Sequence, residues 1–236
     1  MHIPDHFALR RFHAQAKYGM VWIALAKSPL IPIPELPRGV DLLKWRGQYF
    51  KEEWNCSPLR ALENGIDSYH HFFVHRKSLK IALPISSGIV GGIKSRGYGF
   101  CFDSPLTLSG DEILRLANQS NTLVKVARRI TWLPPFALTI ELNWPGGEHQ
   151  CIAWFICPQG DQRCTVMRFY LTNQGEADVA SASIFSLDQK LMEEDRKILE
   201  SLADQVEIFP RDEVSLSVDQ PIVAMRQRLK ELLDSS

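Results

Sequence analysis

Short apolar segments separated by turn residues dominate the middle of the chain. They are rich in aromatic and β-branched side chains, and turn sequences such as Leu-Pro-Pro, Trp-Pro-Gly-Gly and Pro-Gln-Gly-Asp lie between them. Successive strands joined by tight turns favour an antiparallel meander. The expected strands cover Met20–Leu25, Gln48–Trp54, Tyr98–Phe102, Leu123–Thr131, Phe136–Leu142, Gln150–Ile156 and Cys164–Leu171.

Three further segments carry helical patterns and bracket these strands. Pro58–His75 follows Ser57 as an N-cap and has proline in its first turn, where a helix tolerates it best. Phe185–Ile208 is the longest candidate, and Pro221–Leu233 is a second amphipathic segment near the C-terminus. We therefore expect one α+β domain over residues 1–236, with a curved antiparallel sheet packed on a long C-terminal helix.

Composition and charge narrow the class of protein. With 236 residues and 45% hydrophobic content, the chain can bury one large core or two modest ones. Lys plus Arg and Asp plus Glu balance at 27 each, so there is no general electrostatic attraction to nucleic acid or to an anionic membrane. The apolar run Gly19–Leu25 is too short to cross a bilayer and lacks the flanks of a signal peptide.

The cysteines exclude several cofactor sites. The five cysteines are odd in number and scattered, and they form neither a Cys-x-x-Cys nor a Cys-x-His pair. The sequence therefore has no zinc-finger or iron–sulfur ligand motif. Such cysteines suit a reducing compartment, and we expect a cytoplasmic protein.

Residues Glu63–His75 form the segment richest in candidate chemistry. His70, His71 and His75 are three of seven histidines in the chain, and Asp67 precedes them. Two neutral imidazoles and one distant carboxylate are the ligands of mononuclear non-heme Fe(II) sites that keep open coordination positions. The alternative is that one or two of these histidines cap a helix or line a core.

Helix geometry alone pairs His71 with His75, because residues four apart share a face. Residues five apart diverge by roughly 140°, so His70 and His75 meet only if the helix loosens or breaks between them. The intervening Phe72–Val74 segment favours extended backbone enough to allow such a break.

The order of motifs along the chain resembles the catalytic domain of Rieske non-heme iron oxygenases. Glu63–His75 is similar to the signature Glu-Asn-x-x-Asp-x-x-His-x4-His, in the style of the vanillate demethylase and pheophorbide oxygenase-like branch. Tyr18–Leu25 and Tyr49–Trp54 are similar to family segments that precede this signature. Glu193–Glu200 is similar to the segment that carries the third iron ligand. The resemblance covers nearly the whole chain and implies a helix-grip fold.

The resemblance also implies a role for individual residues. His70 and His75 would bind a mononuclear Fe(II) together with Asp195, which taken alone is typical of a solvated helical charge run. Asp67 would bridge an iron-bound histidine to the Rieske cluster of a neighbouring subunit and so carry electrons. Asn64 would lie near the iron without a firm bond. Glu194 is the neighbour most easily confused with Asp195, although it points about 100° away around a helix.

The reaction implied by this branch is O2-dependent hydroxylation or oxidative demethylation of an aromatic or polycyclic substrate. Substrate and O2 would meet in an apolar cavity beside the iron. His71 and four aromatic strand residues are candidates to line such a cavity: Trp132, Phe136, Phe155 and Phe169. For most of the four strand residues, ordinary core packing is the favoured alternative.

Full-length members of the family carry an N-terminal Rieske domain with Cys-x-His and Cys-x-x-His ligand pairs, which this sequence does not contain. Residues 1–15 resemble the junction that follows such a domain. We therefore expect the [2Fe-2S] cluster on a missing domain or a partner, with a ferredoxin or reductase as the electron source, and the family suggests a homotrimer. Two other classes remain open: a helix-grip ligand-binding protein without turnover, and a hydrolytic zinc site that needs no reductant.

Overall fold

The computed structural model describes residues 11–26, 28–41, 44–79, 90–109, 123–173, 179–202, 206–209 and 213–235. The chain divides into two compact units, one that runs to Glu35 and one that begins at Leu36. Because each unit has its own contacts, each is described by itself.

The smaller unit contains a β-hairpin. Strand β1 (His13–Lys17) pairs antiparallel with β2 (Met20–Ala24). Tyr18 and Gly19 form the turn with positive φ angles of 57° and 70°. Positive φ at both central residues is the geometry that fits the twist of a two-residue hairpin. The structure thus confirms the strand predicted from Met20 and adds β1, of which only His13–Gln15 fall in the predicted junction over residues 1–15.

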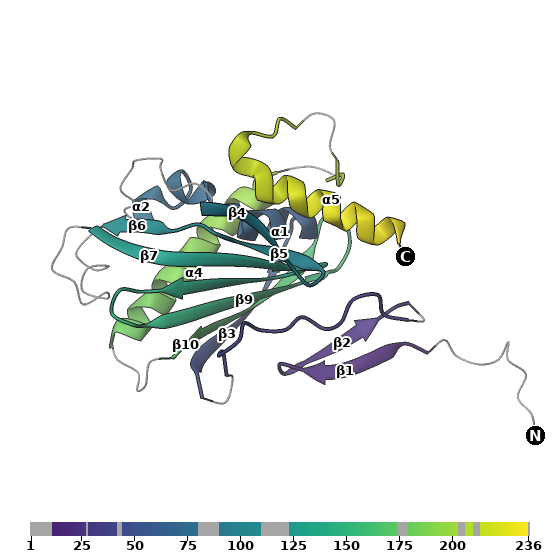
Figure 1. The fold of residues 1–236 in the computed structure, drawn as a ribbon, viewed down its shortest axis with the longest axis horizontal. Helices are drawn as coiled ribbons and strands as arrows, with labels where there is room; N and C mark the ends of the chain where they lie inside the picture. The colour runs from purple at the N-terminus through teal and green to yellow at the C-terminus, as the bar shows by residue number, and fades with distance from the viewer. Residues whose placement is uncertain are drawn as a thin grey trace, which may run out of the picture. The chain divides into compact units, whose positions relative to one another are not determined.

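The larger unit is built on one eight-stranded antiparallel sheet (Figure 1). Its order is β3-β10-β9-β8-β7-β5-β4, and β6 pairs with the part of β7 that β5 leaves free. Strands β7 to β10 follow one another as the expected meander. The strands are β3 (Arg46–Trp54), β4 (Val90–Arg96), β5 (Gly99–Asp103), β6 (Leu106–Ser109), β7 (Leu123–Leu133), β8 (Ala137–Asn143), β9 (His149–Pro158) and β10 (Cys164–Thr172).

Helices cover one face of this sheet. Helix α1 (Pro58–Ile66) contacts β7, β8 and β9, and the long helix α4 (Val179–Ser201) contacts α1, α2 (Arg76–Leu79) and β3. Figure 1 shows α4 running along the sheet on the same side as α1 and α2. Helix α5 (Gln220–Asp234) packs on α1. None of the helices in the described ranges is long and apolar enough to span a membrane.

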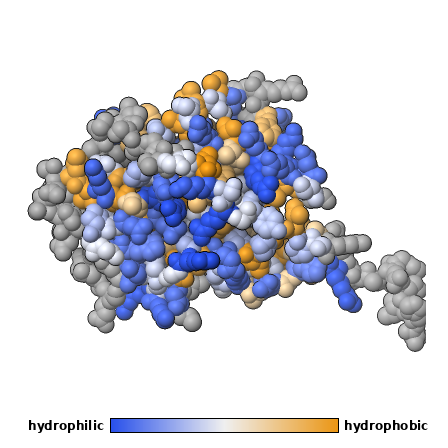
Figure 2. Space-filling model, in the orientation of Figure 1, coloured by the Kyte–Doolittle hydropathy of each residue, from blue (hydrophilic) through white to orange (hydrophobic). Residues whose placement is uncertain are grey.

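Alternation along β7 separates the core from the solvent. Residues from Leu123 to Ile130 alternate between exposed and buried, and Val124, Val126, Arg128 and Ile130 take the buried positions. Period-2 alternation places successive side chains on opposite faces of a sheet. The strand face turned toward the viewer in Figure 2 is largely hydrophilic, in keeping with an antiparallel sheet solvated on one side.

The structure corrects the predicted helix over Pro58–His75, because α1 ends at Ile66. The predicted helix over Phe185–Ile208 begins earlier, at Val179, and ends at Ser201; residues 203–205 lie outside the described residues. The third helical prediction is confirmed as α5. Strands β4 and β6 were not predicted, and β4 contains Gly91 and Gly92, which disfavour a strand assignment.

Helix α1 approaches the sheet closely at Gly65. A Cβ atom at this position would lie 2.5 Å from Leu138 Cδ2 and 3.5 Å from Trp154 Cε3. Glycine therefore sets how near α1, and the loop that follows it, can lie to β8 and β9.

We expect Gly65→Ala to lower the free energy of unfolding. Alanine gains about 1 kcal/mol of helix propensity over glycine, whereas overpacking a core costs about 1–3 kcal/mol. Leu138→Ala alone should cost about 2–5 kcal/mol, and it should cost less in the Gly65→Ala background because the clash is relieved. Denaturant unfolding of the four proteins measures this coupling, and additive effects would contradict the close approach.

Candidate metal centre and its cavity

The chain between α1 and α2 leaves helical geometry at Asp67. This residue has φ −64° and ψ 130°, which is extended backbone. Its carboxylate accepts hydrogen bonds from the backbone N–H of Tyr69 at 2.7 Å and of His70 at 3.1 Å. A short 3-10 helix, His70–Phe72, follows, and α2 begins only at Arg76. The irregular backbone between the two histidines is the break that the sequence reasoning required.

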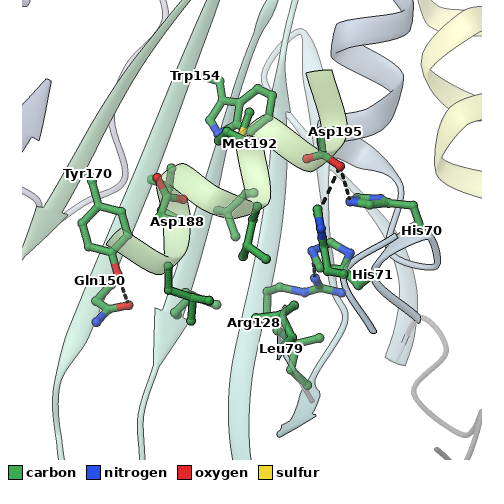
Figure 3. A pocket seen from close by; sticks show the side chains of 18 of the residues that line it. His70, His71, Leu79, Arg128, Gln150, Trp154, Tyr170, Asp188, Met192 and Asp195 are labelled. Atoms are coloured by element: carbon green, nitrogen blue, oxygen red, sulfur yellow. Dashed lines mark hydrogen bonds and ion pairs between the residues drawn. The ribbon is translucent and has the colours of Figure 1, made fainter. Parts of the chain in front are cut away.

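His70, His75 and Asp195 meet as a consequence of this break. Asp195 Oδ1, on α4, lies 3.7 Å from His70 Nε2 (Figure 3). The same oxygen lies 3.1 Å from His75 Nε2. One potential ligand atom from each residue lies within 4.8 Å of the other two. Asp195 and His75 are only 4% and 2% exposed, so water contributes little to the solvation of this group.

A metal ion fits the chemistry of this group. Asp195 Oδ1 is buried and has no hydrogen-bond partner among the described residues. A buried carboxylate is costly unless a cation or hydrogen bonds compensate it. Two ligand atoms at about 2.1 Å from one ion and at a right angle are about 3 Å apart, close to the contacts with Asp195. His70, His75 and Asp195 thus form a possible metal site of two imidazoles and one carboxylate.

A second carboxylate orients His75. His75 Nδ1 lies 2.9 Å from Glu194 Oε2, and Glu194 Oε1 accepts a hydrogen bond from Ser78 Oγ at 2.5 Å. Burial opposes the charged imidazole, but the contacts with Asp195 and Glu194 outweigh it and raise the pKa of His75. A carboxylate at Nδ1 keeps the proton there and leaves the lone pair of Nε2 for a metal.

Asp67 occupies the equivalent place beside the other imidazole. Its Oδ2 atom lies 3.5 Å from His70 Nδ1, while His70 Nε2 faces Asp195. Burial raises the pKa of Asp67, but His70 and two backbone N–H groups more than offset this and hold the pKa below its ordinary value. Each imidazole therefore lies between Asp195 at Nε2 and another carboxylate at Nδ1.

His71 stands apart from the three converging residues. Its Nε2 atom lies 3.2 Å from Arg128 Nη1, and its ring centroid lies 4.1 Å from that of His70. Burial, reinforced by nearby positive charge, holds the pKa of His71 well below its ordinary value. His71 lines the cavity, as expected from the sequence, and the pairing of His71 with His75 suggested by ideal helix geometry is not the arrangement found.

A cavity of about 130 Å³ opens beside the three residues. Its walls come from strands β6 to β10, from α1 and α4, and from the segment between α1 and α2, and they are mainly apolar with a few polar groups among them (Figure 3). The apolar lining includes Leu106, Ile140, Ile152, Trp154, Leu191 and Met192. The polar lining includes Asn64, Arg128, Gln150, Tyr170 and Asp188.

The aromatic residues expected to line this cavity lie elsewhere. Trp132 is fully buried in the core, and its Nε1 donates to the carbonyl of Pro135 at 3.2 Å; Phe136 packs against the same core. Phe155 and Phe169 pack on each other, with ring centroids 5.9 Å apart. Their sequence neighbours Trp154 and Tyr170 line the cavity instead, which places the two phenylalanines on the opposite sheet face.

The sequence analysis did not identify three polar residues that line the cavity away from the candidate metal site, namely Gln150, Tyr170 and Asp188. Arg168 Nη1 donates to Asp188 Oδ2 at 2.5 Å, and Tyr170 Oη donates to Gln150 Oε1 at 2.7 Å. Asp188 precedes Asp195 by two helical turns, so both side chains face the same way from α4. That spacing was the available signal for Asp188.

Comparison with known proteins identifies relatives of the chain. Residues 54–235 match the family model of the vanillate O-demethylase oxygenase C-terminal domain. Methylxanthine N1-demethylase NdmA of Pseudomonas putida is 24% identical over 238 residues, which cover 99% of this chain and 64% of that protein. The chain therefore spans a little under two thirds of the length of this relative.

Two kinds of solved structure share the fold. NdmA of Pseudomonas putida CBB5 superposes with a TM-score of 0.75 at 21% identity, over 100% of this chain and 64% of that one. Dicamba monooxygenase bound to 3,6-dichlorosalicylic acid superposes with a TM-score of 0.73 at 15% identity, over 99% of this chain and 73% of that one. These likenesses confirm the predicted α+β architecture.

We predict that Glu194→Ala weakens metal binding about 10- to 100-fold, because the imidazole of His75 loses the partner that fixes its tautomer and orientation. Glu193→Ala provides the matched control, since Glu193 is exposed and pairs with Lys197 on the outer side of α4. Titration with Fe(II) under anaerobic conditions measures both affinities. Equal affinities for the two variants would show that Glu194 does not orient the ligand.

Proposed function

This chain belongs to the family of vanillate O-demethylase oxygenase C-terminal domains, and we propose that it acts as the catalytic domain of a Rieske-type oxygenase. In this proposal His70, His75 and Asp195 hold one Fe(II) ion. The supporting observation is the approach of two imidazole Nε2 atoms to one buried carboxylate oxygen beside an apolar cavity. Fe(II) at such a site supplies O2 activation, with electrons delivered from outside this chain.

The residues around the site would prepare it for this chemistry. Asp195 provides negative charge to the cation, while Glu194 and Asp67 hold the two imidazoles with their Nε2 atoms inward. Three protein ligands leave coordination positions open toward the cavity. The apolar walls would bind an aromatic substrate and exclude bulk water from the reacting groups.

The proposed electron route passes through Asp67. Its side chain is 24% exposed, and one carboxylate oxygen faces His70. Asp67 therefore connects the metal-binding residues with the protein surface. We assign the [2Fe-2S] donor to a Rieske domain or partner protein, supplied by a ferredoxin or reductase, and a homotrimer is the assembly in which a neighbouring subunit would present it.

The names of the relatives support the reaction class. NdmA is a methylxanthine N1-demethylase, and dicamba monooxygenase was solved with an aromatic acid. We propose that this chain takes part in oxidative demethylation or hydroxylation of an aromatic compound. The cavity volume of about 130 Å³ is similar to that of an engineered protein cavity that binds benzene, so one aromatic ring fits it well.

Anaerobically reconstituted protein is expected to take up about one Fe(II) per chain, and His70→Ala or Asp195→Ala should abolish uptake because each removes a ligand. His71→Asn should retain uptake, since His71 contacts Arg128 and lies outside the ligand set. Iron analysis after desalting measures the stoichiometry.

The outcomes separate the function classes. A wild-type chain that binds small aromatic compounds but no Fe(II) would be a helix-grip ligand-binding protein. Retention of zinc with hydrolytic activity in the absence of reductant would identify a hydrolase. Either result contradicts the oxygenase proposal.

We further expect Asp67→Asn to keep Fe(II) uptake while lowering turnover about 10- to 100-fold, because the amide keeps a hydrogen-bond acceptor but loses the charge beside His70. Substrate-dependent O2 consumption with an added Rieske-type donor and its reductase measures the loss. A variant with full turnover would show that electrons reach the iron by another route.

A further inference from the structure

Two adjacent arginines of β7 have opposite surroundings. Arg128 takes a buried position and is 3% exposed, and it lines the cavity. Arg129 points to the other face, where it forms an exposed ion pair with Asp103 at 2.7 Å. Alternation along the strand accounts for both placements. Arg128 therefore brings a positive charge into a mainly apolar cavity.

The guanidinium of Arg128 contacts only neutral groups. Its Nε donates to the carbonyl of Ser104 at 2.8 Å and its Nη2 to Ser104 Oγ at 2.9 Å, while Nη1 lies 3.2 Å from His71 Nε2. Guanidinium has five N–H donors and no acceptor, so one N–H on each of Nη1 and Nη2 remains. Burial lowers the pKa of Arg128 to about 10, which leaves it a cation at neutral pH.

The other buried arginines of the described chain have carboxylate partners. Arg168 pairs with Asp188, and Arg226 pairs with Glu63, both at 2.5 Å. No carboxylate of the described residues forms an ion pair with Arg128; Asp67 attracts it only at longer range. A buried charge without a partner is strongly unfavourable, so an anion is expected to complete this site.

Unpaired donors in the cavity lining point to the same kind of ligand. Nε1 of Trp144 and of Trp154 are buried without a hydrogen-bond partner in the described part of the chain. His71 Nδ1 is also unpaired, and it carries the proton because His71 Nε2 must accept from the guanidinium. The cavity lining thus contains several hydrogen-bond donors that have no acceptor among the described residues.

We propose that Arg128 is a specificity-determining residue that binds the carboxylate of a small aromatic acid in this cavity. The proposal rests on the proposed function and names the substrate class of the same site. The two remaining N–H groups of the guanidinium suit bidentate pairing with a carboxylate. His71 contacts both Arg128 and the ring of His70, so an acid bound at Arg128 would hold its ring close to the proposed metal ligands.

Binding of 4-methoxybenzoate and of its neutral isostere 4-methoxybenzamide to the metal-free 236-residue chain tests this. Calorimetry, with quenching of tryptophan fluorescence as a second readout, measures the two affinities without a metal that the acid might ligate. The wild type should bind the acid at least about tenfold more tightly, as expected for one charge-assisted, bidentate pair. Arg128→Gln should remove this preference, and Arg128→Lys should keep part of it because lysine supplies charge without the planar fork.

Arg129→Gln is the matched control, since it removes the same charge from the next residue on the outer face; it should leave the preference unchanged. Equal affinity of the wild type for the acid and the amide overturns the proposal, whether or not the Arg128 variants fold. A preference that persists in Arg128→Gln also overturns it. Iron uptake is measured separately, which distinguishes the two proposals. If the wild type binds Fe(II) but does not prefer the acid, only this inference is rejected. If it prefers the acid but does not bind Fe(II), only the proposed function is rejected.

Discussion

The approach of His70 and His75 to one buried carboxylate oxygen is the constraint on which the rest of the structure depends. Asp195 Oδ1 is buried and lies 3.1 Å from His75 Nε2 and 3.7 Å from His70 Nε2, so a positive charge shared with these imidazoles, on a bound cation or on a protonated ring, compensates its negative charge. The two imidazoles can face that oxygen because α1 ends at Asp67, whose carboxylate accepts hydrogen bonds from the backbone N–H groups of Tyr69 and His70. A continuous helix would have turned His70 away from His75.

The sheet and the long helix bring this constraint to a cavity. Helix α4 carries Asp195, and Gly65 lets α1 lie close to the strands that form the cavity wall. Alternation along β7 sends Arg128 inward, where the structure provides no carboxylate from the described residues. The candidate metal ligands and a guanidinium without a carboxylate partner among the described residues thus border the same apolar space, which links O2 chemistry to the recognition of an aromatic acid in our account.

Much of this architecture could be predicted from the sequence, because turn residues and strand patterns are local signals. The meander from β7 to β10 and the helix α5 followed from such signals. The family motifs selected Asp195 within a charge run, and they selected His70 rather than the geometrically favoured His71 as the partner of His75. The structure brings His70, His75 and Asp195 together, and their role as metal ligands remains a prediction. Two features were not predicted. The end of α1 at Ile66 accompanies local hydrogen bonds from Tyr69 and His70 to the Asp67 carboxylate, and the sheet face that places Trp154 rather than Phe155 in the cavity depends on tertiary packing.

Anomalous diffraction at the iron edge from crystals of the Fe(II)-loaded chain tests the central claim most directly. Our account predicts one peak about 2.0–2.2 Å from His70 Nε2, His75 Nε2 and an oxygen of Asp195, with open positions toward the cavity. A peak between His71 and His75, or one bound by Glu194 in place of Asp195, would contradict it. So would an iron-loaded crystal with no ordered peak at this group.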